Sequence, residues 1–226
     1  MNTHVGLYLA GTGSLDGSDV YTAVLAYDQI QKRGWDPRPI GRDVKQGEVR
    51  NHRDAREISV DRNSLTESAR MVRGDIKDMR DVDTDQLLGG VFVGGGGVLS
   101  TWTDFHERGK DCRITERLKF HINDFYNKNQ PIICLGNAGL AVARVLSDVD
   151  EKIQMNPGQN SKIKEAIEYY GIQINSAQPC WDEENRVGTR PGFIREESLG
   201  IIRQEIDTLL SLSEPAFEDV EGDHYR

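Results

Sequence analysis

The sequence predicts an α/β protein in which a mostly parallel sheet carries helices on both faces. Three apolar runs without polar alternation, at residues 5–10, 87–93 and 131–135, are typical of buried parallel strands. Each run ends at a glycine-containing turn, and stretches with helical apolar spacing lie between the runs. This order of strands and helices is typical of a flavodoxin-like, doubly wound fold. The carboxyl ends of its parallel strands meet at one edge, so the three glycine turns are expected to open into one crevice.

The composition limits the class of protein. A chain of 226 residues can bury one full core, and we predict a single domain at 1–212 with a polar C-terminal tail at 213–226. The formal net charge of -9 argues against nucleic acid or an anionic membrane as partner, because both require a basic surface. The sequence shows neither a membrane span nor a signal-peptide pattern, so the cytoplasm is the expected location. The spacing of Cys112, Cys134 and Cys180 indicates neither disulfides nor a metal site.

The first buried strand ends at Gly11-x-Gly13, which predicts the opening strand and helix of the sheet. A dinucleotide-binding turn needs a third glycine at position 16, where this chain has Asp16. We therefore predict no nucleotide and no other cofactor. The amphipathic helix that follows extends through Ile30, and Asp16 or Ser18 is its expected N-cap.

A long polar region separates the first helix from the second buried strand. A weak strand at 36–40 leads into residues 41–63, which is long for a loop in a compact domain. We interpret 41–63 as an insertion or as contact surface. A helix is expected at 63–72 and a short strand at 75–79, followed by a solvated charged connection.

Four consecutive glycines, Gly94 to Gly97, follow the second buried strand. Such a run is costly in chain entropy, so it indicates either a crowded loop or several backbone amides aimed at one point. Both interpretations remain open. Beyond the run, Trp102 and Phe105 either line a pocket or pack in the core. His106 and His121 are predicted on charged, exposed faces, so neither is assigned a catalytic role.

The third buried strand turns abruptly into a helix, and the apex of this turn decides the chemistry. In α/β enzymes a strained strand-to-helix turn presents a nucleophile, and small residues two positions before and after it let strand and helix approach. The register with Gly136 at the apex has small residues at both places, Cys134 and Ala138. Glycine carries no nucleophile and relaxes the backbone strain. We call this turn, Gly136-Asn137, the elbow.

The remaining elements continue the alternation. Helices are expected at 114–126, 161–170 and 197–212, and two strands joined by an acidic turn are expected at 179–187. After Pro215 the sequence is polar, so the tail is expected to be disordered or held by an oligomer contact.

Short motifs outside the glycine turns complete a wider pattern: Asp16-Gly17-Ser18, Asn51-His52, Glu67-Ser68-Ala69-Arg70, Lys110-Asp111-Cys112 and Pro179-Cys180. Together with the turns, they resemble the ES1/ElbB group, once called enhancing lycopene biosynthesis or sigma cross-reacting proteins. This group belongs to the DJ-1/PfpI superfamily of class I glutamine amidotransferase-like proteins. The resemblance extends over about residues 4–212.

The sequence differs from the family pattern at positions expected to form the catalytic site. The family has a cysteine at the elbow apex, where this chain has Gly136. It usually has a glutamate nearby, where this chain has the shorter Asp19, and a histidine followed by an acidic position, where it has Tyr21-Thr22. The activities attributed to the family, a glyoxalase-like conversion of dicarbonyls or related thiol chemistry, require a thiolate. Cys134 lies one strand repeat below the apex; we interpret it as core packing and keep it as the fallback nucleophile.

Two functions remain open from the sequence. The first is a non-catalytic ES1/ElbB-like homologue that self-associates, as a homodimer or larger homo-oligomer, or binds a small anion. The second is a glyoxalase, lyase or hydrolase that acts on small carbonyl compounds through Asp19 with Cys134 or a bound water. A glutaminase-like amidotransferase subunit fits less well, because the apex thiol and a well-placed histidine are missing. The candidate ligand-binding residues are Gly11, Gly13, Gly95, Gly96 and Asn137.

Overall fold

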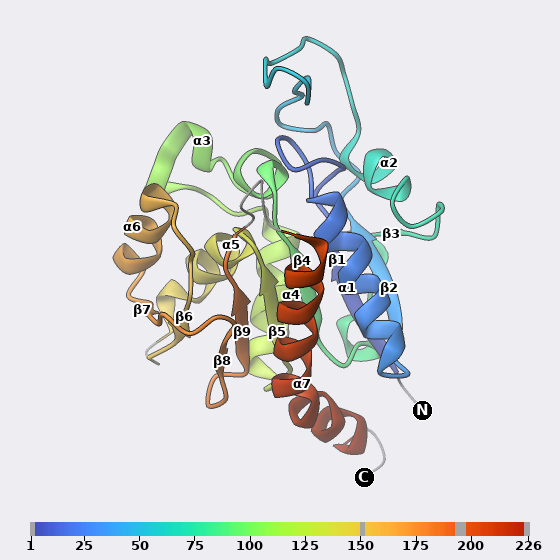
Figure 1. The fold of residues 1–226 in the computed structure, drawn as a ribbon, viewed down its shortest axis with the longest axis vertical. Helices are drawn as coiled ribbons and strands as arrows, with labels where there is room; N and C mark the ends of the chain where they lie inside the picture. Colours follow the sequence, from blue (N-terminus) through green and yellow to red (C-terminus); the bar gives the residue numbers. More distant parts are fainter. Residues whose placement is uncertain (1–2, 150–151, 193–197, 224–226) are drawn as a thin grey trace.

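A seven-stranded sheet forms the centre of the molecule (Figure 1). The computed structural model describes residues 3–149, 152–192 and 198–223. The strand order is β3-β2-β1-β4-β5-β9-β8, and β8 is antiparallel to β9 whereas the other neighbours pair in parallel. The flavodoxin-like α/β prediction is therefore confirmed. The strands of this sheet are β1 (His4–Tyr8), β2 (Asp36–Gly41), β3 (Lys77–Asp78), β4 (Gly90–Val93), β5 (Ile132–Leu135), β8 (Cys180–Asp182) and β9 (Val187–Arg190).

Helices cover both faces of this sheet, and a small second sheet lies beside it (Figure 1). The second sheet consists of β6 (Gln154–Met155) and β7 (Gln173–Ile174). Within the described residues no helix is long and apolar enough to cross a membrane. The α-helices are α1 (Val20–Lys32), α2 (Ser64–Ala69), α3 (Phe105–Arg108), α4 (Glu116–Asn127), α5 (Ala138–Val145), α6 (Ser161–Tyr169) and α7 (Leu199–Asp223).

The two faces of the sheet carry separate apolar cores, because successive side chains of a strand point to opposite faces. Along β5, Ile133 and Leu135 face the core that α1 and α7 cover, whereas Ile132 and Cys134 face the core that α4 and α5 cover. Trp102 is fully buried in the second of these cores, so it packs rather than lining a pocket. The thiol of Cys134 is thereby directed into a core.

The last helix extends beyond its predicted end. The sequence predicts a helix ending at 212 and a polar tail, but α7 continues through Pro215 to Asp223. Phe217 is fully buried and packs on Trp35, with ring centroids 4.6 Å apart. Burial of this aromatic ring offsets the backbone hydrogen bond that a proline inside a helix removes. The helix therefore ends later than predicted, and residues 213–223 are helical. Residues 224–226, and the predicted helix start at 197, lie outside the described residues.

His121 is the second correction. The sequence predicts an exposed face, but its side chain is fully buried on α4, and its Nδ1 lies 2.8 Å from the hydroxyl of Tyr8. The pKa of His121 is lowered to about 4, chiefly because burial desolvates the imidazole and also because the charge of Arg117 lies nearby. The imidazole is neutral at physiological pH and is part of the core. His106, by contrast, is exposed as predicted.

Candidate functional site

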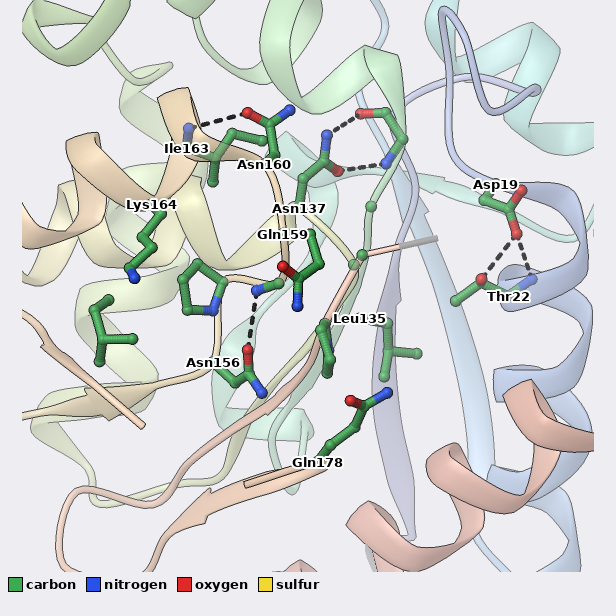
Figure 2. A pocket seen from close by; sticks show the side chains of 18 of the residues that line it. Asp19, Thr22, Leu135, Asn137, Asn156, Gln159, Asn160, Ile163, Lys164 and Gln178 are labelled. Atoms are coloured by element: carbon green, nitrogen blue, oxygen red, sulfur yellow. Dashed lines mark hydrogen bonds between the residues drawn. The ribbon is translucent and has the colours of Figure 1, made fainter. Parts of the chain in front are cut away.

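A cleft of about 630 Å³ lies at the carboxyl edge of the parallel strands. It is bounded by the elbow, the glycine run, the start of α1 and the segments around α6 (Figure 2). Most of its side chains are carboxamides, hydroxyls and short aliphatic groups. The polar side chains that line it are Ser14, Asp19, Thr22, Asn137, Asn156, Gln159, Asn160, Ser161, Lys164, Asn175, Ser176 and Gln178.

The elbow places Gly136 between the end of β5 and the start of α5. Its φ is +70°, a left-handed conformation that glycine adopts without strain. A Cβ added at Gly136 would meet the Cα atoms of Gly94 and Gly192 at 3.6 and 3.8 Å, which are ordinary van der Waals distances. The corner therefore has room for a side chain that points into the cleft, but the chain supplies none.

The four amides of the glycine run all donate within the chain. Those of Gly94, Gly96 and Gly97 donate to backbone carbonyls at 2.7 to 3.0 Å. The amide of Gly95 donates to Oδ1 of Asn137 at 2.6 Å. A Cβ at Gly96 would lie 1.9 Å from the carbonyl oxygen of Leu15, so no other residue fits there. The structure thus matches the crowded-loop interpretation of this run, and its amides are not available to an anion.

Asn137 joins the elbow to the glycine run. Besides accepting from the amide of Gly95, its side chain donates through Nδ2 to the carbonyl oxygen of the same residue, at 3.1 Å (Figure 2). Asn137 occupies the N-cap position of α5 without making a side-chain cap hydrogen bond. The amide of Leu140 donates to the carbonyl oxygen of Asn137 at 3.1 Å, so the amides that the first turn of α5 still offers to a ligand are those of Ala138 and Gly139.

Gly11 and Gly13 are not among the residues that line the cleft. The amide of Gly11 donates to Oγ of Ser68 at 2.9 Å, and that of Gly13 donates to the carbonyl oxygen of Ser18 at 2.8 Å. The loop that contains them packs under residues 41–63: a Cβ at Gly13 would lie 2.3 Å from the ring of His52. Their positive φ angles and these close contacts are a structural reason for glycine at positions 11 and 13.

Asp19 lines the cleft and is also the N-cap of α1. Its Oδ1 accepts from the amide and the hydroxyl of Thr22, both at 2.8 Å, and its side chain is nearly buried. The predicted caps are wrong, because Ser18 binds backbone groups of Ala10 and Val93 instead. Asp16, the other predicted cap, is fully buried and accepts from the amide of Arg50.

Tyr21 and Cys134 both lie away from the cleft. Tyr21 points outward from α1, with 54% of its surface exposed. Cys134 is fully buried, and desolvation raises its pKa far above the ordinary range of a thiol. Cys112 and Cys180 are buried as well. Among the residues that the structure describes, the cleft is therefore lined by no thiol.

The wall of the cleft opposite α1 carries no signal in the sequence. This wall consists of residues 156–160, 174–176 and 178 with Lys164 of α6, and of these segments the sequence predicts only the helix at 161–170. Their side chains carry carboxamides and one ammonium group, which are ordinary surface residues in any sequence. The run Asn156-Pro157-Gly158-Gln159-Asn160 is a recognisable turn, but no local signal shows that it folds toward the elbow.

The sequence has relatives that match it over most of its length, although no family model matches it. The human glutamine amidotransferase-like class 1 domain-containing protein 3, mitochondrial, is 27% identical over 215 residues, which cover 91% of this chain and 80% of that protein. The ES1 protein, mitochondrial, of Danio rerio is 26% identical over 211 residues, which cover 86% of this chain and 78% of that protein.

Solved structures agree with these relatives at the level of the fold. An isoprenoid biosynthesis protein with amidotransferase-like domain from Ehrlichia chaffeensis matches with a TM-score of 0.87 at 24% identity, covering 94% of this chain and 98% of that chain. DJ-1 of Schizosaccharomyces pombe matches with a TM-score of 0.56 at 14% identity, covering 97% of each chain. The resemblance read from the motifs is confirmed by these matches: the chain is similar to the ES1 proteins over most of its length, and it has the fold of the DJ-1/PfpI proteins.

Proposed function

We propose that this protein is a non-catalytic member of its group that binds a small polar ligand in the elbow cleft without forming a covalent bond to it. The observation that carries the proposal is the elbow itself. A cleft of about 630 Å³ is retained, while its apex is Gly136. Thiol chemistry needs a thiolate within reach of the substrate.

The fallback nucleophile does not rescue catalysis in this proposal. Cys134 faces the core between the sheet and α4, and burial disfavours its thiolate. The alternative function uses Asp19 with either Cys134 or a bound water as nucleophile. Without Cys134, its only remaining nucleophile is a water molecule activated by Asp19. Asp19 already accepts two hydrogen bonds from Thr22 as a helix cap, which is a sufficient structural reason for a carboxylate at that place.

A steady-state assay with methylglyoxal tests the non-catalytic proposal. We expect no turnover above the uncatalysed rate by the wild type, and the same result for Cys134→Ser. Turnover that Cys134→Ser abolishes would establish a thiol enzyme. Turnover that survives in Cys134→Ser but is lost in Asp19→Asn would instead establish the water mechanism. Either result overturns the proposal.

An anionic group of the ligand would bind at the helix starts, because the amides of the glycine run already donate within the chain. Both α5 and α6 begin at the cleft, with N-caps at Asn137 and Asn160. Helix N-termini attract negative charge because their first amides lack partners within the helix. A carboxylate or phosphate group of a ligand therefore has donors there, although the amides of Gly95 and Gly96 are occupied.

We also propose that the protein forms a homodimer through the start of α1. Val20, Tyr21 and Val24 are 37%, 54% and 51% exposed within the first turns of this helix. Exposed apolar side chains gathered on one element are typical of contact surfaces. Analytical ultracentrifugation is expected to give a dimer for the wild type and a monomer for Val24→Asp. Leu212→Asp, at a similarly exposed apolar residue of α7, is expected to stay dimeric; a monomeric wild type refutes the proposal.

We propose a reducing compartment for the protein, because its three cysteines are free and buried. The cytoplasm is the expectation from the sequence. The two curated relatives carry the word mitochondrial in their names, which makes the mitochondrion the alternative. Cell fractionation with antibodies against the protein distinguishes the two.

A further inference from the structure

The cleft carries two charged side chains of opposite sign among its described lining residues, Asp19 and Lys164. They come from different elements and lie on opposite sides of the cleft, Asp19 beside α1 and Lys164 on α6 (Figure 2). The polar side chains between them are carboxamides and hydroxyls, which carry no charge. The electrostatic field across the cleft therefore has a negative end and a positive end.

The negative end is a nearly buried carboxylate without a cationic partner in the described part of the chain. Asp19 is 7% exposed, and the groups that donate to its Oδ1 are the amide and the hydroxyl of Thr22, both uncharged. Its other oxygen has no hydrogen-bond partner among the described residues. A carboxylate in this position has acceptor capacity left, and a cationic donor is the group that it binds most strongly.

The positive end combines an ammonium group with a helix start. Lys164 makes no ion pair within the residues that the structure describes, and it lies in the first turn of α6. The cap of this helix, Asn160, accepts from the amide of Ile163, and both residues line the cleft. The N-terminal amides of α6 add partial positive charge to that of Lys164. An acidic group of a ligand is stabilised there.

We propose that the ligand of this cleft is a zwitterion with a cationic amine at one end and an acidic group at the other. The amine binds the carboxylate of Asp19, and the acid binds Lys164 and the start of α6. The inference rests on the proposed function, since it names the ligand class of the same cleft. A simple anion would leave the carboxylate of Asp19 with its two hydrogen bonds from Thr22 but without a cationic partner. A simple amine would leave the exposed ammonium of Lys164 without an acidic partner.

Binding of a length series of α,ω-amino acids tests this proposal. The probes are glycine, β-alanine, γ-aminobutyrate and ε-aminocaproate, with succinate and putrescine as the matched dianion and dication. Binding is followed from the backbone amide NMR signals of Gly136 and Asn160 and by calorimetry. We expect an optimum at one amine-to-acid separation, with succinate and putrescine at least about tenfold weaker, because each forfeits one charge-assisted contact.

Two charge-removing variants assign the ends. Asp19→Asn keeps a good helix cap, so α1 should fold normally while the amine loses its partner. Lys164→Gln removes the ammonium group, and Lys162→Gln is its matched control, since Lys162 is exposed on the same helix but does not line this cleft. We expect Asp19→Asn and Lys164→Gln each to weaken the best amino acid at least about tenfold, and Lys162→Gln to leave it unchanged.

The possible results separate this inference from the proposed function. Succinate that binds as tightly as every amino acid, with no effect of Asp19→Asn, refutes the zwitterion while retaining a ligand-binding cleft. Binding of amino acids that is equally weakened by Lys162→Gln places the ligand outside the cleft and refutes the inference. If no probe shifts the signals of Gly136 or Asn160 at millimolar concentration, the zwitterion is refuted; turnover of methylglyoxal separately decides whether the cleft is catalytic.

Discussion

The carboxamide of Asn137 is joined to the backbone of Gly95 by two hydrogen bonds. Its Oδ1 accepts from the amide at 2.6 Å, and its Nδ2 donates to the carbonyl oxygen at 3.1 Å. The side chain next to the apex therefore occupies the donor that the glycine run would otherwise present to the cleft. At two adjacent positions the cleft therefore lacks what thiol chemistry would use: Gly136 provides no thiol, and Asn137 occupies the amide of Gly95.

Asn137→Ala should free the amide of Gly95. We expect hydrogen exchange at Gly95 to become faster and the free energy of unfolding to fall by about 1–3 kcal/mol, because two hydrogen bonds are lost. Asn137→Asp is the matched control, since it keeps the acceptor for the amide. Exchange at Gly95 that is as slow in Asn137→Ala as in the wild type would contradict this account.

Gly136→Cys should create a reactive thiol. The corner accommodates a Cβ, and a thiol at the start of α5 lies where the helix N-terminus favours the thiolate. The φ of +70° costs the variant about 1–2 kcal/mol of stability. Gly136→Ala has the same strain without the thiol and so measures the strain alone. A new thiol that reacts with a disulfide reagent no faster than free cysteine would show that the elbow does not activate it.

His121 should make stability depend on pH. Because desolvation lowers its pKa from 6.5 to about 4 in the folded protein, the unfolded chain binds more protons between these values. Stability is therefore expected to fall as pH falls from 6.5 to about 4, by up to about 3 kcal/mol. Chemical denaturation across this window measures the slope, and His121→Asn should flatten it. A variant with the wild-type slope would assign the dependence to other groups.

Asp16 should fix residues 41–63 to the loop between β1 and α1. Its buried carboxylate accepts from the amide of Arg50 at 2.7 Å and lies 2.8 Å from Nε2 of His52. Asp16→Ala leaves both groups unpaired, so we expect a loss of about 3 kcal/mol and faster tryptic cleavage within 41–63. Asp54→Ala, which removes an acid within 41–63 that pairs with Arg56 near the surface, is the control and should change neither. Equal cleavage in both variants would refute this role.

Phe217→Ala tests the extension of α7. A fully buried aromatic side chain is lost, so the free energy of unfolding should fall by about 3–5 kcal/mol. Glu218→Ala, at the exposed next position, should change it by less than about 0.5 kcal/mol. If Phe217→Ala lowered the free energy of unfolding as little as Glu218→Ala, the packing of Phe217 would not stabilise the C-terminal part of α7.

The parts of this protein that follow from local patterns were predictable. Apolar runs without alternation indicate β1, β4 and β5 because strands buried on both faces need apolar side chains throughout. The spacing of small residues around Gly136 places it at the elbow, because strand and helix approach closely there. That the glycine run and the elbow meet at one cleft also follows, because parallel strands all end on the same side. The expectation that the turn of Gly11 and Gly13 opens into the same cleft is wrong, because that turn packs against Ser68 and His52.

The sequence by itself determined the three buried strands, the elbow and the missing side chain at its apex, because each depends on residues that are neighbours along the chain. The tertiary structure alone decided that Asn137 binds Gly95, that His121 is buried beside Tyr8, and that Lys164 lies across the cleft from Asp19. The physical reason is that a polar group binds whichever partner the folded chain brings within about 3 Å. That partner can lie anywhere in the sequence, so local patterns do not encode it.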